Sequence, residues 1–206
     1  MSGYGLARLS VVKAKLGITV STNDTTIKNA ILSASAAMEN ETARKLARAG
    51  YSNEVYTAYQ RTVRLYLKNY PVETLTSVKF GTTTQTLSSF TLVSANDAAY
   101  LTSSVGWNTS DSGIKISYTA GYDTRGWDTA LEQIESGDYF NVPYDLEDAI
   151  AEYASIIWLK TFASGQARIG IQSVNRSGES IGYESYVQGY PASFMACVER
   201  YSRFYG

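Results

Sequence analysis

Histidine is absent from this chain of 206 residues, cysteine occurs once and proline three times. Without histidine, the chain lacks the commonest general base and the commonest metal ligand of proteins. A single cysteine excludes an intrachain disulfide and a cysteine-based zinc site. We therefore expect a protein that is not an enzyme and that holds neither a metal ion nor a cofactor.

Long apolar runs and a strong net charge are missing as well. No stretch reaches the roughly 18 apolar residues of a membrane span, and the N-terminal residues show no secretory signal, so we expect no membrane association. The net charge of -1 argues against a free-standing duplex-DNA binder, which needs positive charge to neutralise phosphates. Tyrosine is abundant instead, with 17 copies, and its apolar ring with a polar tip suits protein interfaces.

The strongest periodic pattern covers residues 142–162. Pro143 suits a first helical turn, and the acidic residues of that turn oppose the positive end of the helix dipole. Apolar residues then recur at spacings of three and four: Leu146, Ile150, Tyr153 and Ile157, with Ala149, Ala154, Ile156 and Phe162 widening the stripe. The pattern predicts a core helix that is buried on more than one side.

The segments before this helix change from helical to alternating periodicity. We expect a short helix that Gly17 ends, then a second helix from Asn23 or Asp24 to about Ala49. Apolar and polar residues alternate over 54–68, which predicts a strand. Shorter strands are expected at 75–80, 90–93, 100–102 and 114–118, forming a small, mostly antiparallel sheet.

The C-terminal part has little apolar periodicity until its end. Residues 121–142 are loop-like, with one helical turn expected at 130–134, and the Gly-, Ser- and Tyr-rich residues 166–190 favour an extended arm. Pro191 begins a last short helix. The predicted fold class is α+β: mainly a helical bundle around a long central helix, with an inserted small antiparallel sheet and an extended C-terminal arm plus helix. We expect one domain at 1–165, with its β insert at about 54–120, followed by the arm and helix at 166–206.

Several stretches, taken in this order over residues 6–185, resemble the head–tail connector (adaptor) family of tailed bacteriophages. They are LSVVKAKLGI, NDTTIKNAILSASAAMENET, RTVRLYLKNYPVETLTSVKF, IKISYTAGY, VPYDLEDAIAEYASIIW and GIQSVNRSGESIGYES. The chain departs from the family's pattern in its long insert at 81–113, its loop at 122–141 and its C-terminal helix. No single stretch is diagnostic of the family. The resemblance rests on all six stretches occurring together in this order.

The resemblance implies a structural virion protein of the neck. Such a protein would form a homomeric ring, expected to be a dodecamer, that connects the portal to a downstream tail or stopper protein. The ring would surround the DNA exit channel, so its contact with duplex DNA would be non-specific, and it would be assembled in the cytoplasm of the bacterial host. Two alternatives stay open: a tail-completion or stopper protein of the neck, and a carbohydrate-binding or adhesion module that uses tyrosines as stacking platforms.

Two sets of residues are candidates for contacts in such an assembly. A terminal helix that follows a Gly/Ser/Tyr-rich arm is well placed to dock on a partner through aromatic anchors. The alternative is that this helix fills a groove beside the 142–162 helix. The predicted portal or partner interface comprises Phe194, Val198, Tyr201, Phe204 and Tyr205, with Tyr183 and Tyr186 from the arm.

The basic residues Arg44, Lys45 and Arg48 could face DNA in a channel without reading its sequence. The alternative is that they are ordinary charges at the C-terminal end of a helix. Asp148 and Glu152 lie four residues apart, on one face of the predicted helix. A hydrolase that uses two carboxylates could exploit such a pair. No partner base accompanies them, which favours a solvated helix face instead.

Overall fold

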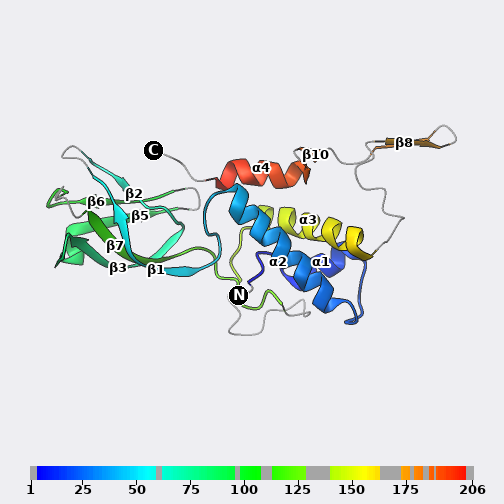
Figure 1. The fold of residues 1–206 in the computed structure, drawn as a ribbon, viewed down its shortest axis with the longest axis horizontal. Coiled ribbons are helices and arrows are strands. Elements are labelled where there is room, and N and C mark those ends of the chain that lie inside the picture. Colours follow the sequence, from blue (N-terminus) through cyan, green and yellow to red (C-terminus); the bar gives the residue numbers. More distant parts are fainter. Residues whose placement is uncertain are drawn as a thin grey trace. The chain divides into compact units, whose positions relative to one another are not determined.

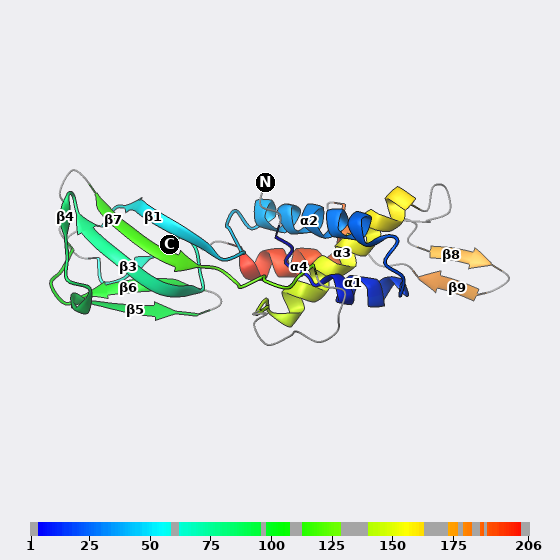
Figure 2. The same cartoon turned by 90° about the horizontal axis from the view of Figure 1, so that it is seen from below.

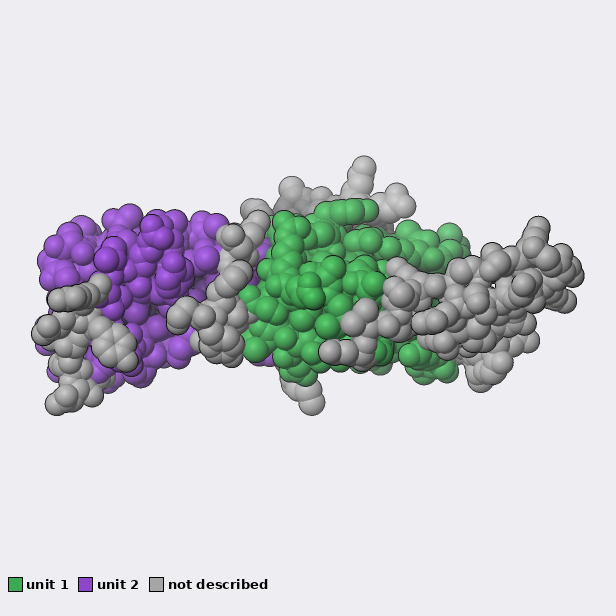
Figure 3. All heavy atoms as spheres, turned by 90° about the horizontal axis from the view of Figure 1, so that it is seen from above, with its two compact units in different colours: residues 1–43, 123–202 green, residues 44–122, 203–206 purple. Residues whose placement is uncertain are grey.

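A computed structural model describes residues 4–58, 62–95, 98–107, 113–128, 140–162, 173–176, 179–182, 186–187 and 189–202. The chain forms two compact units (Figures 1 and 3). Unit 1 combines residues 1–43 with 123–202, and unit 2 comprises residues 44–122. The predicted domain boundary at residue 165 lies outside the described residues.

Unit 1 contains the helices of the described chain: α1 (Leu9–Leu16), α2 (Asp24–Glu41), α3 (Tyr144–Phe162) and α4 (Ala192–Tyr201) (Figure 2). Helix α3 packs against each of the other three. The buried side chains recur at helical spacing along α2 and α3, as an amphipathic pattern requires. The buried apolar side chains of unit 1 as a whole include Leu6, Leu9, Val12, Ile27, Ile31, Met38, Leu146, Ile150, Ala154 and Phe194.

The two N-terminal helices end for local reasons. Gly17 takes the predicted left-handed conformation after α1, with φ of 67°. Helix α2 ends at Glu41, so the prediction that it continues to about Ala49 is wrong. The Thr42 hydroxyl donates to the Met38 carbonyl oxygen, and Ala43 adopts a positive φ of 53°, which ends the helix.

Unit 2 is built from two antiparallel sheets with a short 3₁₀ turn, η1 (Leu87–Ser89). The larger sheet has the order β1-β7-β3-β4, and the smaller has the order β2-β6-β5. The bounds are β1 (Ala49–Tyr56), β2 (Leu65–Tyr66), β3 (Val72–Phe80), β4 (Thr83–Thr84), β5 (Phe90–Ser94), β6 (Ala99–Ser103) and β7 (Ile114–Ala120).

Alternation along the strands separates a core face from an outer face. In β7, the even-numbered residues from Ile114 to Ala120 are buried, whereas the residues between them are partly exposed. In the smaller sheet, Leu65 pairs with Leu101, which also pairs with Leu92 on its other side. Leu65 and Leu101 belong to one hydrophobic core shared by both sheets, and the partly buried Leu92 packs against it.

The predicted fold class is therefore wrong in its main feature. The described residues do not form a helical bundle around a long central helix with a small inserted sheet; they form an α+β fold in which the sheets are a separate unit. The physical reason is that the apolar residues of the sheets pack on one another. A period of two predicts strands, but it does not say which strands share a core.

Two further segments differ from the predictions. The single strand predicted over 54–68 is two strands: β1 ends at Tyr56, and β2 contains only Leu65 and Tyr66. The predicted arm includes, where it is described, β8 (Ser173–Arg176) paired with β9 (Glu179–Gly182), and β10 (Tyr186–Val187) paired with β11 (Tyr190–Pro191). The helical turn predicted at 130–134 lies outside the described residues.

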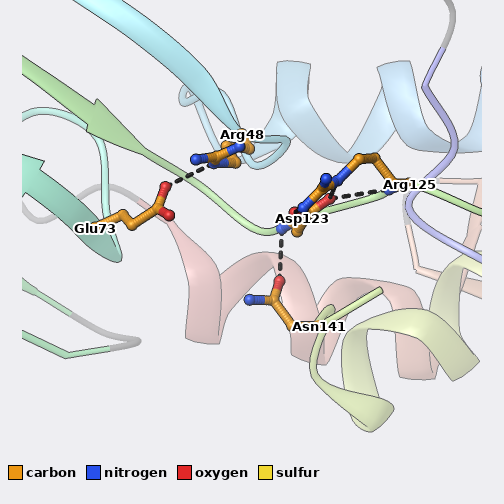
Figure 4. Close-up of polar contacts among 5 residues, drawn as sticks. All are labelled: Arg48, Glu73, Asp123, Arg125 and Asn141. Atoms are coloured by element: carbon orange, nitrogen blue, oxygen red, sulfur yellow. Dashed lines mark hydrogen bonds and ion pairs between the residues drawn. The ribbon is translucent and has the colours of Figure 1, made fainter. Parts of the chain in front are cut away.

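Hydrogen bonds hold the connecting segments within each unit. In unit 2, the Tyr122 N–H donates to the Leu46 carbonyl oxygen at 2.7 Å, and the Arg48 N–H donates to the Tyr122 carbonyl oxygen at 2.8 Å. In unit 1, the Asp123 N–H donates to the Asn141 side chain, and the Asp123 carboxylate accepts hydrogen bonds from the Arg125 guanidinium (Figure 4). The chain thus leaves and re-enters unit 1 through two hydrogen-bonded segments.

Candidate interaction surfaces

Helix α4 carries an aromatic cluster with its neighbours. The Phe194 ring lies 4.9 Å from the Tyr190 ring, with the planes 12° apart, and 4.9 Å from the Tyr153 ring of α3. Tyr153 and Tyr190 are themselves 5.2 Å apart. Phe194 is fully buried. Three mutually contacting rings, one of them in the core, hold the start of α4 on α3.

Polar contacts hold the other end of α4. Asp145, in the first turn of α3, accepts hydrogen bonds from Tyr201 Oη at 2.9 Å and from Arg200 Nη1 at 2.7 Å. The Cys197 thiol lies 3.4 Å from the Asp145 carbonyl oxygen, and burial raises the pKa of this thiol to about 11. Burial disfavours the charged thiolate, so Cys197 is a packing residue.

The predicted interface residues of α4 are thus buried within unit 1. Phe194, Val198 and Tyr201 expose at most 7% of their surface. The arrangement corresponds to the alternative in which the last helix packs beside the 142–162 helix. Tyr186 pairs through its backbone with Pro191, whereas Tyr183, Phe204 and Tyr205 lie outside the described residues. Contact of this set with a partner remains a prediction.

The three basic residues predicted to face DNA have different environments. Arg44 is 4% exposed, with its guanidinium 3.6 Å from the centre of the Tyr70 ring, and it donates to the Tyr70 carbonyl oxygen at 2.7 Å. Arg48 is exposed and forms an ion pair of 2.6 Å with Glu73 (Figure 4). Lys45 is exposed. Arg44 therefore has a packing role, and a DNA contact of the other two remains a prediction.

The carboxylates of α3 are engaged in contacts within unit 1. Asp148 pairs with Lys15 at 2.8 Å, and Glu152 accepts a hydrogen bond from Ser193. Glu147, almost fully buried, receives hydrogen bonds from the Arg8 backbone and guanidinium, and this contact raises the pKa of Arg8. Among the described residues, no group of three or more His, Cys, Asp or Glu side chains is placed to hold a metal ion.

A buried polar cluster lies inside unit 2. The phenolic oxygens of Tyr56 and Tyr118 lie 2.9 Å apart, and both donate to Glu54 Oε2. Burial, followed by the hydrogen bond to Glu54, raises the pKa of Tyr118 to about 12 and also raises the pKa of Tyr56. Both hydroxyls therefore stay protonated near neutral pH and act as donors that fix β1 against β7.

The outer face of the smaller sheet carries an aromatic row that the sequence analysis did not single out. Tyr66 pairs with Tyr100, and Tyr100 pairs with Val93 on its other side. Tyr66 is 47% exposed, and the Arg64 guanidinium lies 4.9 Å from the centre of the Tyr100 ring. The signal was present, because alternation around the buried Leu65 places Tyr66 on the opposite face.

A groove in unit 1 lies between α2 and the second half of α3. Its volume is about 240 Å³, and Trp158 Nε1 on its wall donates to Thr26 Oγ1 at 3.2 Å. Ala30 also lines it. The other lining residues are Asn29 and Ser33 from α2, and Ile157 and Thr161 from α3.

No helix in the described part of the chain is long and apolar enough to cross a membrane.

The comparisons with known proteins concern the fold. No protein-family model and no curated protein sequence matches the chain. Among solved structures, the fold is similar to that of a chain in the structure called "Neck of empty GTA particle computed with C6 symmetry", with a TM-score of 0.53 and 17% identity. The match covers 96% of this chain and 90% of that chain, so the α+β architecture is shared over nearly the whole length.

Proposed function

We propose that this protein is a structural, non-enzymatic component of the neck of a tailed bacteriophage or a phage-like particle. The observation that carries the proposal is the fold similarity to a chain of a particle neck, which extends over residues of both units. The resemblance of six stretches of the sequence to the head–tail connector family supports the same assignment from different information. In this role the protein belongs to the virion, and its assembly takes place in the host cytoplasm.

The finer proposal is a ring of identical copies between the portal and a downstream tail or stopper protein. The neck structure was computed with six-fold symmetry, which a ring of six copies satisfies and a dodecamer satisfies as well. A ring around the DNA channel needs no base-specific contacts, because phosphate contacts of Lys45 and Arg48 are independent of sequence.

Two experiments test this proposal: the first tests the location in the neck, and the second tests the ring on the portal. Gold-labelled antibodies against the protein should bind assembled particles at the head–tail junction; labelling elsewhere, or none on accessible necks, would contradict the neck assignment. Purified protein should also co-sediment with purified portal rings, and electron microscopy should show a ring stacked on the portal. Absence of portal binding, with junction labelling intact, would favour the tail-completion or stopper role.

One observation favours a second candidate, a carbohydrate-binding module. Tyr66 is 47% exposed beside the partly buried Tyr100, whose ring lies under the Arg64 guanidinium, and the exposed Tyr66 ring is a surface on which a sugar ring can stack. A glycan array with the purified protein tests this candidate. Binding in the micromolar range or tighter that Tyr66→Ala abolishes would support it, and no binding would remove it.

A further inference from the structure

The outer face of the larger sheet carries two lysines directly opposite each other. Lys79 of β3 pairs with Lys115 of β7. Their neighbours Val78 and Ile116 are fully buried, so alternation places both lysines on the face away from the core, where they are partly exposed. Like charges directly opposite each other in a sheet are destabilising. Stability alone therefore does not account for this pair.

The described carboxylates of unit 2 do not neutralise the two lysines. Glu54 accepts hydrogen bonds within the buried polar cluster, and Glu73 forms its ion pair with a different cation. Lys79 Nζ donates to the neutral Asn53 side chain at 3.2 Å. Neither Lys79 nor Lys115 forms an ion pair with a residue that the structure describes. Two positive charges on this face are thus available to an anionic ligand.

The rest of this face consists mainly of small polar side chains. In their row across the strands β1, β7, β3 and β4, the lysines are flanked by Val55 and Thr84 (Figure 2). The next two rows contain hydroxyl and amide side chains that are at least partly exposed. They are Asn53, Thr74, Ser77, Ser117 and Thr119. These three rows hold no carboxylate, and their ammonium, hydroxyl and amide groups are of the kinds that donate to phosphate oxygens.

We infer that the outer face of the larger sheet binds the phosphate groups of duplex DNA without reading its sequence. This inference rests on the proposed function, since a neck protein that surrounds the exit channel lies beside duplex DNA. A phosphate between the two ammonium groups also offsets their mutual repulsion. Residues 44–122 contain eight Lys or Arg and four Asp or Glu, so unit 2 has an excess of positive charge although the whole chain has a net charge of -1.

An acidic protein surface is the alternative ligand for such a face. A second copy of this chain is a poor source of it, because Asp24, Asp145 and Asp148 of unit 1 already form ion pairs within their own unit. Duplex DNA presents one negative charge for about every 1.7 Å of its axis, none of them paired with a protein cation beforehand. The observations therefore favour DNA.

Fluorescence anisotropy with a labelled duplex of random sequence tests the inference in the full chain. The affinity of the wild type should fall about 60-fold or more between about 20 mM and 200 mM salt, because two phosphate contacts give a slope of about -1.8 in log K against log salt. Lys79→Gln/Lys115→Gln should weaken binding about tenfold or more at the lower salt and make the slope shallower by about 1.8, or 0.9 for each lost contact.

The matched control removes two positive charges elsewhere. Arg64→Gln/Lys160→Gln changes an exposed residue on the outer face of the smaller sheet and one on α3, and it should lower the affinity about threefold at most. The urea denaturation midpoint of Lys79→Gln/Lys115→Gln should equal or exceed that of the wild type, because the like-charge pair is removed. A lower midpoint would mean that the lysines serve the fold, and would overturn the inference.

Three binding results would overturn the inference as well. They are an unchanged affinity and slope in Lys79→Gln/Lys115→Gln, an equal loss in the control, and no binding of the wild type at about 20 mM salt. If the wild type binds purified portal rings in place of DNA, and Lys79→Gln/Lys115→Gln does not, the face docks on an acidic protein surface. Antibody labelling of the particle junction is independent of these outcomes, so the neck assignment can survive the failure of this contact.

Discussion

Tyr201 at the end of α4 donates a hydrogen bond to Asp145 in the first turn of α3, with 2.9 Å between Oη and Oδ1. Tyr201 is 3% exposed, so most of its side chain is removed from water. Arg200 contacts the same carboxylate at 2.7 Å, but its side chain is 69% exposed. The two contacts share the Asp145 carboxylate as acceptor, but the Tyr201 side chain is buried and the Arg200 side chain is exposed. The contact with Tyr201 is therefore expected to contribute more to stability than the contact with Arg200.

The first prediction concerns this carboxylate. Asp145→Ala should lower the free energy of unfolding by about 1–3 kcal/mol, because it removes the carboxylate that accepts a hydrogen bond from the largely buried Tyr201 side chain. Arg200→Ala should cost less than about 1 kcal/mol, since an exposed ion pair contributes little. Urea denaturation followed by circular dichroism measures both values.

A double variant provides the control for this prediction. Asp145→Ala/Tyr201→Phe should recover part of the loss caused by Asp145→Ala, because the hydroxyl that lost its hydrogen bond to Asp145 is then removed. A loss from Arg200→Ala as large as that from Asp145→Ala would show that the ion pair, and not the buried hydrogen bond, holds α4.

The second prediction contrasts the two faces of β2. Leu65 is 5% exposed and Tyr66 is 47% exposed, although the two residues are adjacent. Leu65→Ala should cost about 2–5 kcal/mol, as for other buried leucines, whereas Tyr66→Ala should cost about 1 kcal/mol or less from its ring pair with Tyr100. Equal losses in urea denaturation would mean that the outer face of the smaller sheet is part of the core.

The periodicity of the sequence predicted most of the helices and strands, but not how the strands pack together. Periodicity located α1, α3 and α4 and the strands β3, β5, β6 and β7, because each repeats a local pattern in its own residues. It did not locate the end of α2, where the change of direction depends on Ala43 at positive φ, a conformation that alanine rarely adopts. It also could not reveal that two sheets share one core, since that depends on contacts distant in sequence.

The candidate surfaces were predictable to a smaller extent. The aromatic residues of α4 were found by their helical spacing, but the same spacing describes a helix that docks on a partner and one that packs on α3. Contacts such as that of Tyr153 with Phe194, which join residues 41 positions apart, place α4 on α3. The groove between α2 and α3 likewise depends on the packing distance of two helices, which no local pattern encodes.

The third prediction concerns alkaline pH. The pKa of Tyr118 is raised to about 12 from an ordinary value of 10.0, chiefly by burial, so above pH 10 the unfolded chain loses a proton that the folded chain retains. The contribution of Tyr118 to stability is therefore complete below about pH 10 and is lost as the pH rises toward 12. Urea denaturation midpoints measured from pH 9 to 12 should fall across this window.

Comparison with Tyr118→Phe isolates this residue from the other groups that titrate in the same range. The difference in unfolding free energy between the wild type and Tyr118→Phe should shrink as the pH rises from 10 to 12, because only the wild type loses stability by ionisation at this position. Tyr66→Phe, on the exposed outer face, serves as the control. A constant difference between wild type and Tyr118→Phe would contradict the raised pKa.

The fourth prediction compares two glycines with positive φ. Gly121 follows β7 with φ of 103°, and a Cβ atom there would lie 2.5 Å from the Ala47 carbonyl oxygen. Gly17 has φ of 67° and no atom within 4 Å of such a Cβ. Gly17→Ala should therefore cost only the left-handed conformation, about 1–2 kcal/mol. Gly121→Ala should cost more, at least about 3 kcal/mol, because it also forces two backbone segments apart.

The segments that Gly121→Ala displaces are hydrogen-bonded to each other. The Gly121 N–H donates to the Pro71 carbonyl oxygen at 2.9 Å, and the next residue, Tyr122, exchanges backbone hydrogen bonds with Leu46 and Arg48. The substitution should thus lower the thermal midpoint of the β-sheet signal in circular dichroism well below that of Gly17→Ala. Similar midpoints for the two variants would mean that the backbone around Ala47 relaxes easily, and that the close approach at Gly121 does not hold the connecting segments of unit 2 together.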